Sequence, residues 1–130
     1  MNLLDENFPC DQAALLVAWR VPCRQIGHEV ARLGTQDEEI IPLLHRLRRV
    51  TLFTLDEDFH KRRLAHASYC LAWLDVRADD AALTVRRFLR HARFNAVAKR
   101  MGIVARLGES GVHFWQRNQT AKMRVGWNLS

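Results

Sequence analysis

The sequence predicts one α/β domain, built on a parallel, doubly wound sheet with a C-terminal hairpin. Short apolar runs alternate with amphipathic helical patterns through most of the chain, as in strand–helix–strand units. The last two apolar runs are instead joined by a glycine-containing turn, as in a hairpin. With 130 residues, 48% of them hydrophobic, the chain has the size of a single domain over residues 1–130.

The first strand is expected at residues 2–4, an apolar segment that ends at Asp5 and Glu6. Pro9 suits the first turn of a helix, because its φ is fixed and it has no backbone N–H to leave unbonded. This helix is expected to stop before Pro22. Its apolar face is expected to comprise Ala14, Leu15, Ala18 and Trp19.

A weaker second strand is expected over residues 23–30. The segment 35–38 then has the form of a capping box, in which Thr35 and Glu38 each satisfy a backbone donor of a new helix. Pro42 is expected to kink that helix or to confine its regular part to the later residues. The apolar face of this helix is expected to comprise Ile40, Leu43, Leu44 and Leu47.

The central strand is expected over residues 50–55, an unbroken apolar and β-branched run typical of a strand covered on both faces. Another strand is expected over 69–76, and a strongly periodic helix follows it. The buried stripe of that helix is expected to comprise Ala81, Val85, Phe88, Leu89 and Ala92. Its basic ridge is expected to comprise Arg86, Arg90 and Arg93. Strands over 103–106 and 112–115 form the expected hairpin.

Charge and cysteine usage exclude some classes of protein. The net charge is +6, with acidic residues concentrated early and basic residues late, which suits a polyanionic partner. No apolar run reaches the ~18 residues that a spanning helix needs, and the first residues include acids where a signal peptide is basic, so we expect a cytoplasmic protein without membrane contact. Three widely spaced cysteines indicate neither a disulfide framework nor a thiolate zinc site.

Acidic residues follow two of the predicted strands. Ligands of open α/β sheets bind at the carboxyl ends of the strands, where Asp5, Asp56 and Asp58 are expected. Carboxylates that converge need a cation to stay ionised, and oxygen ligands favour Mg²⁺ or Mn²⁺. Other interpretations stay open: Asp5 as a helix cap, the acids near Asp37 as ordinary helix-opening residues, and the D-x-D motif as turn chemistry.

Three segments resemble the short PIN-like proteins, relatives of the PIN-domain ribonuclease toxins of bacterial toxin–antitoxin pairs. They are Leu3-Leu4-Asp5-Glu6-Asn7-x-Pro9, Asp37-Glu38-Glu39-Ile40 and Thr54-Leu55-Asp56-Glu57-Asp58-Phe59. The resemblance covers roughly the first half of the chain. It implies a PIN-like three-layer α/β/α fold and a Mg²⁺- or Mn²⁺-dependent endoribonuclease. It also implies RNA as substrate and an antitoxin protein as partner, and it leaves open whether the chain forms a homodimer.

The resemblance also assigns roles. It implies that Asp5, Asp56 and Asp58 are metal ligands and that Asp37 or Glu38 supplies a further catalytic acid from a helix. A metal-activated water would then hydrolyse the phosphodiester. The basic side chains expected to bind substrate phosphates are Lys61, Arg62, Arg63, Arg86 and Arg90. Asp75, which the resemblance does not require, is either a further ligand or the salt-bridge partner of an arginine.

Two other functions compete with the nuclease. A non-catalytic PIN-like protein would use its basic half to bind RNA or a partner without cleaving it. A phosphoacceptor receiver domain would use Asp5, Glu6 and Asp56, but the expected lysine followed by proline after a fifth strand is absent from the sequence, and Asp58 lies two residues beyond the supposed acceptor.

Overall fold

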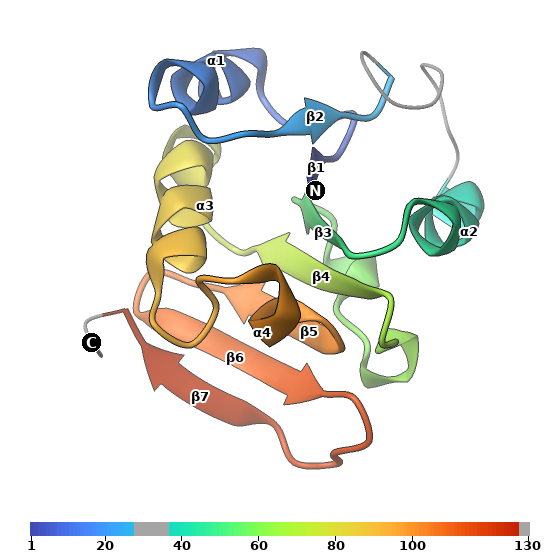
Figure 1. Ribbon diagram of the computed structural model, residues 1–130. Helices are drawn as coiled ribbons and strands as arrows, with labels where there is room; N and C mark the ends of the chain where they lie inside the picture. The colour runs from blue at the N-terminus through green and yellow to red at the C-terminus, as the bar shows by residue number, and fades with distance from the viewer. Residues whose placement is uncertain (28–36, 128–130) are drawn as a thin grey trace.

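The fold is that of a computed structural model, which describes residues 1–27 and 37–127 and, for residues 37 and 38, the backbone alone. One seven-stranded sheet has the order β2-β1-β3-β4-β5-β6-β7 (Figure 1). β1 to β5 are parallel to their neighbours, and β6 and β7 are antiparallel. The strands are β1 (Asn2–Leu4), β2 (Arg24–Gln25), β3 (Val50–Thr54), β4 (Tyr69–Leu74), β5 (Ile103–Leu107), β6 (Gly111–Gln116) and β7 (Met123–Gly126). The helices are α1 (Cys10–Ala18), α2 (Asp37–Leu47), α3 (Ala81–Arg90) and α4 (Val97–Arg100), with 3₁₀ turns η1 (Glu57–Phe59), η2 (Arg62–Leu64) and η3 (Ala78–Asp80).

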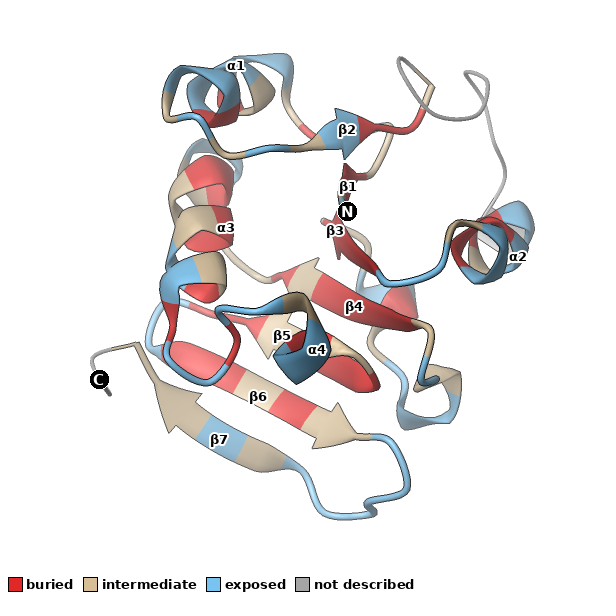
Figure 2. Ribbon diagram, in the orientation of Figure 1, coloured by how far each residue is buried: buried red, intermediate tan, exposed pale blue. Residues whose placement is uncertain are grey.

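Helices pack on both faces of the sheet, as predicted for this α/β class. On one face, Leu16 of α1 and Phe88 of α3 share a hydrophobic cluster with Phe53 and other strand residues. On the other face, α2 packs against β1, β3 and β4 through a second cluster that includes Leu44 and Leu52. Every residue of β3 is buried (Figure 2), so the predicted central strand is confirmed.

The predicted inner face of the first helix is wrong. Leu15 is 38% exposed, whereas Gln12 and Leu16 are buried. The physical reason is a polar contact: the Gln12 side-chain oxygen accepts a hydrogen bond of 2.9 Å from the backbone N–H of Ala82, at the start of α3. Because this contact fixes Gln12 inward, Leu16, one turn later, also faces the sheet. The helix does end before Pro22, as expected.

The predicted second strand and the predicted acidic helix each include residues that lie outside the described part of the chain. Of the predicted strand 23–30, residues 28–30 lie outside the described residues, and within 23–27 the strand β2 is confined to Arg24–Gln25. The predicted capping residue Thr35 also lies outside them. α2 runs from Asp37 through Pro42 to Leu47, so Pro42 does not confine the helix to its later residues.

The basic helix ends earlier than its periodicity predicts. α3 stops at Arg90, so Arg93 lies beyond it, and Ala92 is exposed rather than part of the buried stripe. The cause is His91, whose ring accepts a hydrogen bond from the backbone N–H of Arg93 through Nδ1 and meets the carbonyl of Gly126 through Nε2 at 3.0 Å. These contacts tie the end of α3 to the end of β7.

The C-terminal part is larger than the predicted hairpin. β5 and β6 pair antiparallel as expected, but β5 also continues the parallel sheet beside β4. α4 and β7 were not predicted, and β7 adds a further antiparallel strand at the edge. Over the described residues, none of the helices combines the length and the apolar character that crossing a membrane requires.

Candidate acidic site

Asp5 lies at the carboxyl edge of the sheet, directly after β1. Its backbone N–H donates to the carbonyl of Phe53 at 3.0 Å, which extends the pairing of β1 with β3 by one step. This places Asp5 beside Thr54, whose hydroxyl donates to the Asp5 carboxylate at 2.7 Å. The Thr54 side chain is buried, so this hydrogen bond is shielded from water and fixes the orientation of the carboxylate.

Thr54 also links Asp5 to the second acidic segment. Its hydroxyl oxygen accepts a hydrogen bond of 3.0 Å from the backbone N–H of Asp56. A hydroxyl can donate once and accept from another group, so Thr54 uses both functions to connect Asp56 to Asp5. The structure therefore brings the first and second acidic segments to the same edge, between β1 and β3.

Asp56 and Asp58 have different surroundings. Asp56 caps η1, because one of its carboxylate oxygens accepts the backbone N–H of Asp58 at 2.9 Å. The turn chemistry considered for the D-x-D motif is therefore present. Asp58 is exposed, as are the predicted phosphate-binding residues Lys61, Arg62 and Arg63 that follow it.

Gln25 holds the acidic turn after β1 in place. Its side-chain nitrogen lies 3.2 Å from the carbonyl oxygen of Asp5, 3.3 Å from that of Glu6 and 3.1 Å from that of Phe8. Gln25 is buried, and two amide protons shared among three carbonyls fix the path of this turn from the neighbouring strand.

The predicted metal ligands Asp5, Asp56 and Asp58 all lie in the described part of the chain. Within residues 1–27 and 37–127, no group of three or more acidic, histidine or cysteine side chains is close enough to hold an ion. The side chains of the predicted acids Asp37 and Glu38 lie outside the description. Asp5 and Asp56 each keep one carboxylate oxygen that is not used in the contacts above. Carboxylate oxygens are ligands that Mg²⁺ uses, often one or two of them together with substrate phosphates and water.

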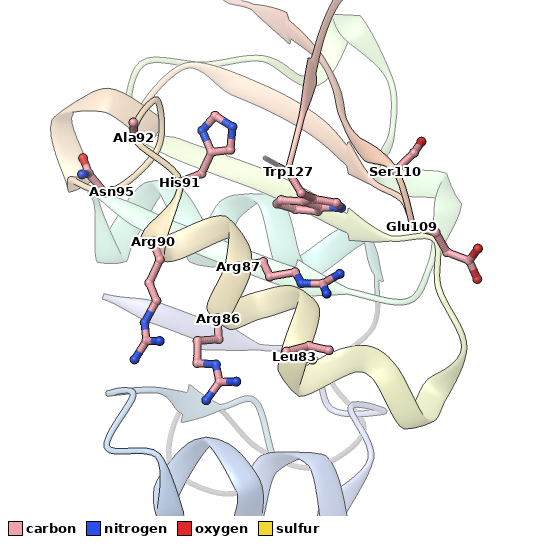
Figure 3. Close-up of a pocket in the computed structure, with 10 residues that line it drawn as sticks. All are labelled: Leu83, Arg86, Arg87, Arg90, His91, Ala92, Asn95, Glu109, Ser110 and Trp127. Atoms are coloured by element: carbon pink, nitrogen blue, oxygen red, sulfur yellow. The ribbon is translucent and has the colours of Figure 1, made fainter. Parts of the chain in front are cut away.

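Two residues of the predicted arginine ridge, Arg86 and Arg90, line a separate groove of about 940 Å³ (Figure 3). The groove lies between α3, the loop that follows it and the β5–β6 turn, and Trp127 closes one side. Arg87 and Arg90 are exposed there, whereas the Arg86 guanidinium lies 3.9 Å from the ring centroid of Trp19. Neither Asp5 nor Asp56 contributes to its lining, so the groove and the acidic edge are distinct surfaces.

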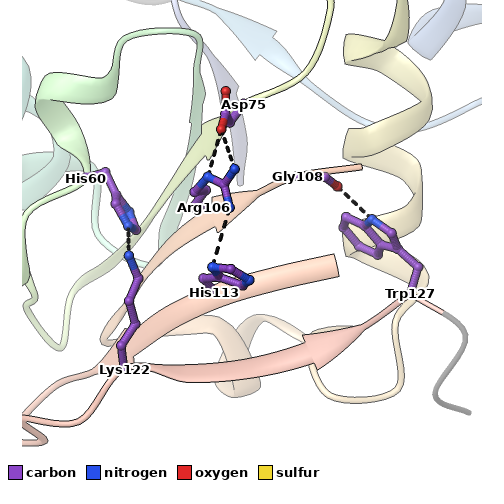
Figure 4. A network of polar contacts seen from close by, with 7 residues as sticks. All are labelled: His60, Asp75, Arg106, Gly108, His113, Lys122 and Trp127. Atoms are coloured by element: carbon purple, nitrogen blue, oxygen red, sulfur yellow. Dashed lines mark hydrogen bonds and ion pairs between the residues drawn. The ribbon is translucent and has the colours of Figure 1, made fainter. Parts of the chain in front are cut away.

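Asp75 is a salt-bridge partner, which settles one of the two roles considered for it. Its carboxylate oxygen lies 2.7 Å from Nε and 2.6 Å from Nη2 of Arg106, a charge-assisted pair between β4 and β5 (Figure 4). Arg106 also lies 3.4 Å from Nδ1 of His113.

A histidine follows the second acidic segment and lies against this pair. The Lys122 ammonium is 2.7 Å from Nε2 of His60 (Figure 4). An ammonium can only donate, so Nε2 accepts and the ring is neutral. Burial, and then the positive charges of Lys122 and Arg106, lower the pKa of His60 to about 4.

Sequence reasoning missed Thr54 and Gln25 as parts of the site. Thr54 was assigned only to the strand. Its alternation with Leu52 places both on one face, but its contact with Asp5 depends on the register between β1 and β3, which the sequence does not reveal. Gln25 carries a weaker signal, because it lies between Arg24 and Ile26 in a segment with only a weak strand pattern.

Fold and site together define an α/β protein with hydrogen-bonded acidic residues at the carboxyl edge of a mostly parallel sheet. Compared with known protein families, curated proteins and solved structures, the chain matches none of them.

Proposed function

We propose that this protein is a Mg²⁺- or Mn²⁺-dependent endoribonuclease of PIN-like type, acting as the toxin of a toxin–antitoxin pair. The observation that carries the proposal is the hydrogen-bonded connection from Asp56 through Thr54 to Asp5. It joins two acids from distant segments of the sequence, Thr54 alone being 49 residues from Asp5, at the sheet edge where α/β proteins bind ligands.

The strand order adds support. The first five strands have the order 2-1-3-4-5, in which the direction of winding changes between β1 and β3. Ligands of such sheets bind in the crevice at that point. Asp5 follows β1 and Asp56 follows β3, so both acids flank the switch point.

In this proposal the side chains have separate tasks. Thr54 and Gln25 hold Asp5 in a fixed orientation, which reduces the reorganisation needed when substrate binds. Asp5 and Asp56, with Asp37 or Glu38 from α2, supply carboxylate oxygens to the cation. A bound Mg²⁺ or Mn²⁺ supplies an activated water and stabilises negative charge on the phosphate. Lys61, Arg62 and Arg63, just beyond η1, meet the neighbouring phosphates.

The test is cleavage of mixed RNA with and without Mn²⁺ by the wild type and by Asp5→Asn and Asp56→Asn variants. We expect metal-dependent cleavage that both variants reduce at least a hundredfold, a loss of about 2.7 kcal/mol in transition-state stabilisation. The control is Asp79→Asn, the same change at an exposed acid after β4. A wild type as inactive as the variants contradicts the proposal, and RNA binding without cleavage then favours the non-catalytic PIN-like protein.

The strand order also favours a phosphoacceptor receiver domain as a second candidate, since receivers share the order 2-1-3-4-5. In that case Asp56 accepts the phosphoryl group. Arg106 and Leu107 end β5, where the sequence argument expects lysine followed by proline. Incubation with a small phosphodonor separates the two candidates, because only a receiver gains a base-labile acyl phosphate that Asp56→Asn abolishes.

A further inference from the structure

One straight row of side chains crosses the sheet from the acidic site to its far edge. Thr54, Trp73, Arg106, His113 and Arg124 are direct partners in the registers of β3 to β7. Direct partners project from the same face of a sheet. With strands ~4.8 Å apart, the four steps of this cross-strand row cover roughly 19 Å. The row begins at Thr54, whose hydroxyl binds Asp5.

Aromatic rings accompany the row. The ring centroid of His60 is 5.4 Å from that of Trp73 and 4.7 Å from that of Trp115, with interplanar angles of 41° and 32°. Trp115 lies two residues after His113 on β6, on the same face. Both indoles remain partly exposed. We call His60, Trp73 and Trp115 the aromatic cluster.

Positive charge gathers around the same side chains. The Lys122 ammonium lies 4.3 Å from the ring centroid of Trp115, and Arg106 lies 5.9 Å from that of Trp73. The pKa of His113 is lowered, first by burial and then by the positive charges of Arg106, Arg124 and Lys122. Two acids contact the row: Asp75 is paired with Arg106, and Asp5 accepts the Thr54 hydroxyl at the start of the row. Lys122 and Arg124 are both exposed.

The helices cover this face unevenly. Leu44 of α2 and Phe59 of η1 are buried in the cluster that covers the β1, β3 and β4 side. Over β5 to β7, by contrast, Arg106 and His113 are partly exposed and Arg124 is exposed. An open sheet face that carries aromatic rings and cations has the composition of surfaces that bind single-stranded nucleic acid.

We propose that single-stranded RNA binds along the cross-strand row, with bases stacked on the aromatic cluster and phosphates on Lys122, Arg106 and Arg124. An entering base takes the place of the exposed Lys122 chain over Trp115, and the displaced ammonium meets a phosphate. The strand then continues towards the acidic edge, where Thr54, at the buried start of the row, orients Asp5. As a path for substrate, this surface rests on the proposed nuclease function, but binding can be measured without cleavage.

The experiment measures binding of a labelled single-stranded oligouridylate by fluorescence anisotropy, in chelator to prevent cleavage, at several salt concentrations. Trp115→Leu removes a stacking surface and keeps an apolar side chain, and we expect about tenfold weaker binding or more. Arg124→Glu reverses one charge, and we expect weaker binding together with a salt dependence reduced by about one phosphate contact. Arg24→Glu is the matched control, because Arg24 is exposed on β2, at the sheet edge opposite to β7, which carries Arg124.

Several outcomes decide the proposal. Circular dichroism and unfolding first establish that each variant is folded. The proposal is overturned if Trp115→Leu and Arg124→Glu both bind RNA as tightly as the wild type. It is also overturned if Arg24→Glu weakens RNA binding as much as they do. A wild-type protein that binds duplex RNA more tightly than single-stranded RNA also overturns the proposal. So does a Trp115→Leu variant that differs from the wild type in self-association but not in RNA affinity. If the two variants weaken RNA binding but the wild type shows no metal-dependent cleavage, the RNA-binding surface is supported and the nuclease function is contradicted. If the wild type cleaves RNA and neither variant changes binding or cleavage, the nuclease function is supported and the RNA-binding surface is contradicted.

Discussion

Thr54 donates its hydroxyl proton to the carboxylate of Asp5 across 2.7 Å, from a fully buried position at the end of β3. The same oxygen accepts the backbone N–H of Asp56. One hydroxyl therefore orders two acidic segments that are far apart in the chain. It also begins the row that leads across the sheet to Arg124.

Thr54→Val tests this arrangement. The variant keeps the β-branched shape but leaves the Asp56 N–H without its acceptor and Asp5 without its donor. We expect the free energy of unfolding to fall by about 1–3 kcal/mol, measured by urea denaturation, and RNA cleavage to fall with it. Thr54→Ser keeps the hydroxyl and should retain most of both properties. Equal losses in the two variants would point to packing rather than to the hydrogen bonds.

The elements predicted best are those with strong local patterns. The apolar run before Asp56 predicted the buried β3, and the glycine-containing turn predicted the pairing of β5 with β6. Contacts between distant segments could not be predicted. Gln12 turns α1 through a bond to Ala82, and His91 ends α3 through contacts with Arg93 and Gly126, neither of which leaves a periodic signal.

The residues of the acidic site also divide into those that the sequence predicted and those that it did not. The positions of Asp5 and Asp56 at one edge followed from the rule that parallel strands end together. The residues that orient them did not, because Thr54 and Gln25 act through register and through a neighbouring strand. The ridge residue Arg86 was expected to be free for phosphate, but its guanidinium lies over Trp19, in a groove apart from the acids.

Gln25→Leu should loosen the acidic turn. The substitution removes an amide that lies within 3.3 Å of the carbonyl oxygens of Asp5, Glu6 and Phe8, and so removes its hydrogen bonds to this turn. We expect a loss of about 1–3 kcal/mol in the free energy of unfolding and faster hydrogen exchange in the turn after β1. Arg24→Leu, at the exposed neighbouring position, is the control. Unchanged exchange in Gln25→Leu would show that the turn is held by other contacts.

Cation binding should be visible as stabilisation, independently of cleavage. A ligand that binds only the folded state stabilises it by about 2.7 kcal/mol at a hundred times its Kd. We therefore expect Mn²⁺ to raise the Tm of the wild type and of Asp79→Asn, and to raise it much less in Asp5→Asn and Asp56→Asn. If Mn²⁺ raised the Tm of all four proteins equally, the ion would bind at a site that does not involve Asp5 or Asp56.

Gly111 should tolerate no side chain. It has φ +157°, and a Cβ built there would lie 2.1 Å from the carbonyl oxygen of Val125 on β7. The backbone of β7 must move away to accept it, so we expect Gly111→Ala to cost about 2 kcal/mol or more in the free energy of unfolding. Gly108→Ala is the control in the same turn, because its Cβ would meet only the Arg106 side chain, at 3.7 Å. Thermal denaturation of the two variants should differ clearly.

His60 should make stability depend on pH. Its pKa is lowered from 6.5 to about 4 in the folded protein, by burial first and then by Lys122 and Arg106. Between these two values the unfolded chain binds more protons at this site than the folded one does, so the free energy of unfolding falls as the pH falls from about 6.5 towards 4. His60→Gln keeps an acceptor for Lys122 but does not titrate. The stability difference between the wild type and His60→Gln should therefore be smaller at pH 4.5 than at pH 7.5 in urea titrations. A difference that stays constant with pH would mean that His60 has the same pKa in the folded and the unfolded protein, and that neither burial nor the neighbouring positive charges lower it.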